Sequence, residues 1–209
     1  MEIIMRKLVI SLLFGLVFSM VLMAYADTAQ KHISDSVLRL HIVANSDSEN
    51  DQNVKLKVRD ALLTRFGTAL SQAENREEAE KIINENKEQI KETAEKVLSE
   101  NGCGYGAKAM CADVHFPVKK YENIMLPPGN YRALKVVLGN GAGKNWWCVM
   151  YPPLCFDTSP SGRADDDEIL RKSLSESEYE IITESERKLP VKFRFKILEI
   201  FDKFNNGAK

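Results

Sequence analysis

Two lengths of the chain alternate between apolar and polar residues with the period of a β-strand. In residues 37–46, VLRLHIVANS, three leucine or isoleucine side chains fall on one face, and Arg39 and His41 fall on the other. Residues 191–201, VKFRFKILEIF, alternate in the same way. Side chains along a strand point to opposite faces in turn, so both stretches are predicted to be strands, the second closing the sheet late in the chain.

Between these two stretches, apolar residues first recur at helical spacing. One run extends from Val54 to Ala69 and a second from Ala79 to Leu98, which predicts two helices. Ser48 with Asp51 three positions later resembles a capping box at the start of the first helix. Asn101-Gly102 is typical of a helix C-terminus and closes the second helix.

From residue 105 onward the pattern returns to strands. KAMCADVHFPV, NYRALKVVLG and NWWCVMYPP have strand character, and the turn sequences LPPGN and GNGAG separate them. Residues 157–190 are polar and are predicted to form a surface insertion, with a short helix around Ile169–Leu174. The order of one strand, two helices and several strands favours a single α+β domain over residues 27–209, with a mostly antiparallel sheet.

The N-terminus has the pattern of a secretory signal peptide. Arg6 and Lys7 precede an uncharged run from Leu8 to Ala24, and Ala24-Tyr25-Ala26 forms a small-x-small site before Asp27. Cleavage is therefore predicted between Ala26 and Asp27, with an uncleaved membrane anchor as the alternative. Under both interpretations residues 27–209 lie outside the cytoplasm.

Composition limits the classes of partner. The full chain has a net charge of −1, and removal of residues 1–26 leaves slightly more acidic than basic residues. This balance gives no reason to expect nucleic acid or an anionic membrane as the partner. The sequence contains no P-loop, dinucleotide fingerprint, HExxH motif or nucleophile elbow, and no cofactor, metal or small-molecule substrate is predicted.

The chain has four cysteines, at positions 103, 111, 148 and 155. An even number in an exported protein permits two disulfides, with three pairings that the sequence does not distinguish. Cys148 as a thiol nucleophile, with His41 or His115 as its base, is the enzymatic alternative. Its apolar neighbours disfavour the thiolate, so a structural role is preferred. A zinc site made of Cys103, Cys111, His115 and Cys148 lacks the close paired spacing of structural zinc.

Two blocks of sequence resemble one protein family. LRLHIVANSDSENDQ and the following LKVRDAL, within residues 38–62, resemble the opening block of stage II sporulation protein R. GKNWWCVMYPPLCF, residues 143–156, is similar to that family's second block, and FPVKKYENIMLPPGNYRALKVVLGNGAG between them also looks like the family. The resemblance extends over roughly residues 37–156.

The resemblance implies a signalling protein of endospore formation. Family members are exported from the forespore into the space between the forespore and mother-cell membranes. There they activate a membrane-embedded, aspartic-type protease of the mother cell, which processes the sigma-E precursor. The resemblance therefore implies a secreted protease activator and no enzyme, and Asp157-Thr158-Ser159 is not mistaken for a protease motif. An envelope hydrolase or thiol enzyme using Cys148 stays the alternative, and a structural envelope domain is a third reading.

The residues expected to contact the partner are exposed members of the two blocks. Tryptophan and arginine are enriched at binding hot spots, and Trp146 and Trp147 are expected on opposite faces of one strand. The family block also implies a structural role for Cys148 and Cys155, as a disulfide or as packed side chains. The predicted partner-binding residues are Arg39, His41, Asn45, Asp47, Asp51, Arg59, Lys144, Asn145 and Trp146.

Overall fold

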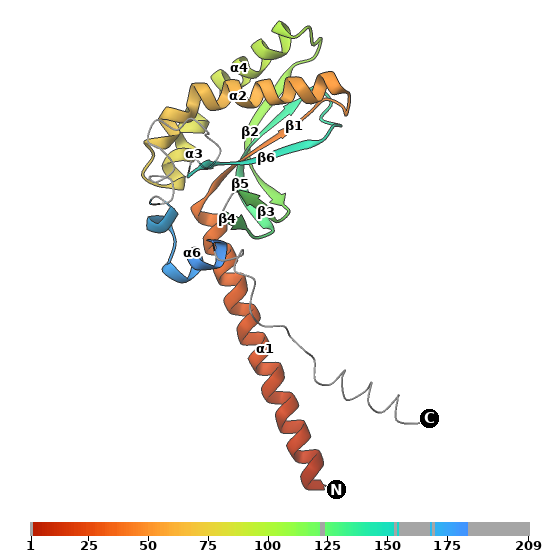
Figure 1. The fold of residues 1–209 in the computed structure, drawn as a ribbon, viewed down its shortest axis with the longest axis vertical. Helices are drawn as coiled ribbons and strands as arrows, with labels where there is room; N and C mark the ends of the chain where they lie inside the picture. Colours follow the sequence, from red (N-terminus) through yellow and green to blue (C-terminus); the bar gives the residue numbers. More distant parts are fainter. Residues whose placement is uncertain (1, 122–123, 153, 155–167, 169, 184–209) are drawn as a thin grey trace, which may run out of the picture.

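The chain begins with one long apolar helix, α1 (Glu2–Ser36), that extends away from the body of the protein (Figure 1). In this computed structural model, residues 2–121, 124–152, 154, 168 and 170–183 are described. The large apolar side chains from Ile3 to Tyr25 are all exposed, and α1 is the helix in the described chain that is long and apolar enough to cross a membrane. Its last turns behave differently, because Ala29 and Ile33 are buried against the body. The helix thus joins an export-type segment directly to the domain core.

A mixed four-stranded sheet forms the centre of the domain. Its strand order is β2-β5-β1-β6, with β1 parallel to β5 and the other two pairings antiparallel. A separate hairpin, β3-β4, lies beside it. The strands are β1 (Leu38–Val43), β2 (Ala107–Phe116), β3 (Lys119–Tyr121), β4 (Ile124–Leu126), β5 (Gly129–Leu138) and β6 (Asn145–Tyr151). The predicted α+β class with a mostly antiparallel sheet is confirmed.

Three helices cover one face of the sheet, α2 (Glu49–Ser71), α3 (Arg76–Glu85) and α4 (Lys87–Glu100) (Figure 1). Leu40 and Ile42 of β1 point into the core beneath them, as their alternation predicted. The prediction of a single second helix was wrong, since the run divides into α3 and α4 at Asn86. The predicted end is confirmed: Gly102 has a positive φ, and the Cys103 N–H donates to Leu98 O across the last turn.

The opposite face of the sheet is partly covered by chain from three places. The end of α1, the β3-β4 hairpin and residues 170–183, which include α6 (Glu176–Thr183), form a second apolar cluster on this face. Leu170, Tyr179 and Ile182 are buried in it. Within the predicted surface insertion, residues 170–183 thus cover the sheet with these apolar side chains, while charged residues of the same segment such as Lys172 and Glu180 are exposed. The predicted late strand at 191–201 and the triplet at 157–159 lie outside the described residues.

Candidate partner-binding surface

The two sequence blocks meet at one end of the sheet. The backbone N–H of Lys144 donates to Asp47 Oδ1 at 2.7 Å, and the Asn140 N–H donates to Asn45 Oδ1 at 2.9 Å. In the same loops the Gly143 N–H donates to Ala44 O. Residues that are about one hundred positions apart are thus joined by backbone and side-chain hydrogen bonds. The structure brings together the blocks that the sequence analysis treated as one surface.

Asp51 is the centre of the first block. Its carboxylate accepts hydrogen bonds from Asn45 Nδ2, Ser46 Oγ and Tyr105 OH, and only 6% of the residue is exposed. These bonds, first the one from Ser46 and then the one from Tyr105, lower the pKa of Asp51. The Asp51 N–H donates to Ser48 Oγ at 3.2 Å, so Ser48 caps α2, but the carboxylate does not return the bond as in a capping box. The side chains of Asn45 and Asp51 therefore form intramolecular hydrogen bonds that fix the loop between β1 and α2.

Arg39 is completely buried, which contradicts its expected exposure. Its guanidinium carbon lies 3.9 Å from the ring centre of Phe116 and 4.7 Å from that of Tyr131, while Nη2 donates to Tyr121 OH at 2.5 Å. Among the described residues, Nε and Nη1 have no hydrogen-bond partner and no carboxylate forms an ion pair with Arg39. Burial lowers the pKa of Arg39 and raises that of Tyr131 to about 12. The protein thus holds a cation among aromatic rings without a described counter-charge.

His41, also expected to be exposed, lies beside this aromatic group and is only 7% exposed. Its ring stacks on Trp147 at a centroid distance of 6.1 Å and contacts the edge of Phe116. Nε2 is 2.7 Å from Asn145 Oδ1, which joins the two blocks again on this side of the sheet. Burial lowers the pKa of His41.

The two tryptophans point to opposite faces, as predicted. Trp146 packs against the helix-side core, and the Arg59 guanidinium lies 4.6 Å from its ring centre. Trp147 packs against the second cluster, with Lys119 Nζ 4.5 Å from its ring centre. Both residues are half-buried. Sequence reasoning missed Lys119 and Tyr105, because neither stands in an exposed position of the two blocks.

The cysteines differ in state. Cys148 is disulfide-bonded and 3% exposed, whereas Cys103 and Cys111 are free thiols. The pairings of Cys148 with either of these two are therefore excluded, and Cys155 lies outside the described residues. A bonded, buried sulfur is not a thiolate nucleophile, so the enzymatic alternative based on Cys148 has no support in the geometry.

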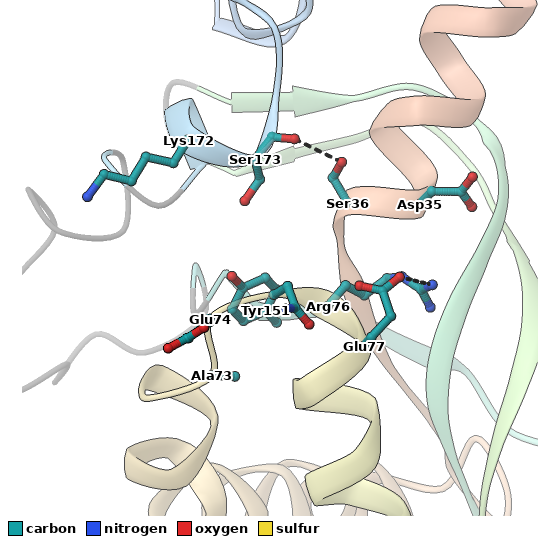
Figure 2. Close-up of a pocket in the computed structure, with 10 residues that line it drawn as sticks. Asp35, Ser36, Ala73, Glu74, Arg76, Glu77, Tyr151, Lys172 and Ser173 are labelled. Carbon is teal, nitrogen blue, oxygen red and sulfur yellow. Dashed lines mark hydrogen bonds and ion pairs between the residues drawn. The ribbon is translucent and has the colours of Figure 1, made fainter.

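A pocket of about 520 Å³ lies away from the two blocks (Figure 2). It lies between the end of α1, the start of α3 and the helical turn that carries Ser173, and Ser36 Oγ donates to Ser173 O at 3.2 Å. Arg76 pairs with Glu77 at 2.7 Å on its wall. The mixed acidic and basic lining favours no ligand class, and no predicted partner-binding residue lines the pocket. The predicted cleavage bond, between Ala26 and Asp27, lies elsewhere, inside the continuous helix α1.

Comparison with known proteins identifies the family. The model of a family described as stage II sporulation protein R matches residues 34–160, which is more than half of the chain. The chain belongs to the stage II sporulation protein R family. A relative named stage II sporulation protein R, from Bacillus subtilis (strain 168), is 36% identical over 170 residues, covering 77% of this chain and 76% of the relative. No solved structure matches the chain significantly.

Membership of the stage II sporulation protein R family confirms the resemblance that the two blocks carried. It connects the protein with sporulation, and the apolar helix α1 fits a signal peptide and secretion. The matched residues begin within the last turns of α1, where the chain first becomes buried. The family region therefore includes the sheet and helices α2 to α4, while the buried residues of segment 170–183 lie beyond it.

Proposed function

We propose that this protein is a secreted signal of endospore formation that activates a membrane-embedded, aspartic-type protease of the mother cell. The forespore exports it into the space between the forespore and mother-cell membranes. Activation of the protease leads to processing of the sigma-E precursor. The protein acts by binding and not by catalysis. The observation that carries this proposal is the family match over the folded body directly behind an export-type helix.

An activator of this kind works through a difference in affinity. It shifts a protease from an inactive to an active conformation or assembly only if it binds the active one more tightly. A difference of about 2.7 kcal/mol shifts that balance roughly a hundredfold. The end of the sheet where the two blocks meet is rigid, because Asp47, Asn45 and Asp51 all form intramolecular hydrogen bonds there. A rigid surface loses little conformational entropy on binding, which favours this mode of action.

Signal cleavage between Ala26 and Asp27 belongs to the same proposal. Cleavage there leaves the last turns of α1, with Ala29 and Ile33, attached to the body through their buried contacts. The uncleaved alternative keeps the domain next to the exporting membrane through the exposed apolar part of α1. Both forms present the same folded body outside the cytoplasm.

The test is reconstitution in a cell that does not sporulate. The full chain, the protease and the sigma-E precursor are expressed together, and cleavage of the precursor is followed. We expect cleavage to depend on the chain and to disappear when residues 2–24 are deleted, because export is then lost. Trp146→Ala tests whether the predicted contact residue Trp146, on the helix-side face of the sheet, is needed for activation, and Cys103→Ser is the control on a free thiol outside the two blocks.

Two results separate this proposal from its alternatives. Cys148→Ser and the unchanged protein are compared at equal amounts of folded, exported protein. Precursor cleavage that persists in Cys148→Ser agrees with an activator that does not use this sulfur in chemistry. If a folded, exported chain leaves the precursor uncleaved, the activator proposal is wrong.

A further inference from the structure

The second face of the sheet is open at the end where β1 finishes. One row of side chains crosses all four strands there, since Met110 pairs with Lys135, Lys135 with His41, and His41 with Trp147. In contrast to the preceding row, which contains the buried Arg39, this row reaches solvent: Met110 is 38% exposed, and Lys135 and Trp147 are half-buried. We call this area the distal face and define it by the six residues Lys108, Met110, Lys119, Lys135, Val137 and Trp147.

The distal face is basic. Lys108, Lys119 and Lys135 form no ion pair with any residue that the structure describes. The buried guanidinium of Arg39, also without a described carboxylate, lies one row away on the same side of the sheet. A buried charge is screened less by solvent than an exposed one, so Arg39 adds to the positive potential of this side.

The helical layer on the other side is arranged differently. Three of its lysines stand four positions before glutamates, in the pairs Lys81–Glu85, Lys91–Glu95 and Lys96–Glu100. Among the described residues, the helical layer therefore carries charges of both signs, whereas the charged side chains of the distal face are lysines.

The centre of the distal face is apolar and aromatic. Trp147 is held between the His41 ring and the Lys119 ammonium group, and its Nε1 donor has no hydrogen-bond partner in the described part of the chain. Val137 and Met110 extend the apolar area toward β2. A tryptophan fixed by its neighbours and surrounded by cations has the character of a binding hot spot.

The position of this face in the domain indicates on which side its partner lies. α1 ends at Ser36 and β1 begins at Leu38, so β1 carries the chain away from the apolar helix (Figure 1). The row at His41 is therefore farther from α1 than the covered row at Arg39. A membrane that contains α1 lies at the opposite end of the domain, which disfavours its headgroups as the occupant.

We infer that the distal face is the docking surface for an acidic extracytoplasmic segment of the partner protein. Carboxylates of that segment pair with Lys108 and Lys135, and an apolar side chain of the segment packs on Trp147. This inference rests on the proposed function, because it describes the surface through which the activator contacts its protease. Its basis is charge complementarity, since the cations lack described counter-charges.

Charge reversal on the distal face tests this assignment. Lys108→Glu/Lys135→Glu is compared with Lys81→Glu/Lys96→Glu, which makes the same change in net charge on the helical layer. Binding of each exported protein to the protease in phosphatidylcholine proteoliposomes is measured, together with precursor cleavage in the reconstituted cell. We expect the distal variant to bind roughly tenfold or more weakly and to lose its salt dependence, while the helical variant matches the unchanged protein.

A charge-conserving variant and a check of folding make the outcomes decisive. Lys108→Arg/Lys135→Arg keeps the charges and should retain binding, and matched circular dichroism spectra establish that all variants fold. If the unchanged protein activates cleavage and the distal variant binds equally well, the docking surface is wrong while the proposed function stands. If the unchanged protein fails to activate cleavage, the proposed function is wrong and this assignment fails with it.

The remaining outcomes identify a different occupant. Distal-face-dependent binding to protease-free phosphatidylglycerol vesicles, but not to phosphatidylcholine vesicles, would assign the surface to anionic lipid headgroups. Dimerisation of the purified protein that the distal variant abolishes would assign it to a second copy of the chain. Either result overturns the inference of an acidic protein segment.

Discussion

Tyr105 donates a hydrogen bond to the carboxylate of Asp51, 54 positions earlier in the sequence. The bond joins the start of α2 to the loop that leads into β2. Asn45 and Ser46 donate to the same carboxylate, so this buried charge accepts three side-chain hydrogen bonds. The end of the sheet where the two family blocks meet depends on this group.

Asp51→Asn should lower the free energy of unfolding by about 2–3 kcal/mol, because hydrogen bonds to a charged acceptor are the strong ones and buried donors lose their partner. Tyr105→Phe should cost less, and the two changes together should be less than additive, since they share one bond. Urea denaturation followed by circular dichroism measures each value. Asp60→Asn, at an exposed carboxylate on the same helix, is the control and should change stability little. Full additivity of the double variant would contradict the shared bond.

The close approach of the two loops gives a second prediction. A Cβ atom at Gly143 would lie 2.2 Å from the backbone oxygen of Ser46, so Gly143→Ala forces the loops apart. We expect the free energy of unfolding of Gly143→Ala to fall by more than about 1 kcal/mol, because the contact between the two blocks is weakened. Gly104→Ala is the control, because nothing lies within 4 Å of its added Cβ. Equal melting temperatures for the two variants would show that the loops move apart without cost.

The parts of the fold with local periodicity were predictable. Alternation along β1 assigned Leu40 and Ile42 to one face, and the adjacent tryptophans to opposite faces, because a strand places neighbours on alternate sides. The sequence also predicted the end of α4 at Asn101-Gly102. The division at Asn86 was not predicted, since apolar spacing continues from α3 into α4 and no glycine or proline marks the change.

The parts that depend on distant chain were not predictable. Arg39 occupies a polar position of an alternating strand, and its burial results from Phe116, Tyr121 and Tyr131, which lie at least 77 residues later. Leu170 and Ile182 are hidden among polar residues, so their segment resembled a surface insertion. The basic distal face was missed for a similar reason, because Lys108, Lys119 and Lys135 come together only through strand pairing and the position of the hairpin.

Arg39 provides a third prediction, which separates the effect of its buried charge on stability from the effect of its packing. A buried cation without a counter-charge among the described residues carries an uncompensated desolvation cost, so Arg39→Met, similar in length and apolar, should leave stability unchanged or raise it. Arg39→Ala removes packing against Phe116 and should destabilise by about 2–5 kcal/mol through the cavity that it leaves. Melting temperatures of the two variants test this difference. A clear loss of stability in Arg39→Met would mean that the aromatic rings stabilise the charge beyond its desolvation cost.

His41 makes stability depend on pH in a defined direction. Burial lowers its pKa below the ordinary value of 6.5, so above that pH the ring is neutral in both the folded and the unfolded chain. As the pH falls below about 6.5, the unfolded chain takes up a proton that the folded chain resists, and the contribution of His41 to stability is lost. Lys135, which lies beside the ring, acts in the same direction by disfavouring a second positive charge.

The melting temperature should therefore fall between pH 7 and pH 5.5, and His41→Gln should make that part of the profile flatter. The matched control is His115→Gln, which makes the same substitution at an exposed histidine on β2. Asp51 does not interfere in this window, because its lowered pKa places its effect below the ordinary value of 3.8. An identical slope in the unchanged protein and in His41→Gln would show that the ring takes up its proton as easily when folded as when unfolded.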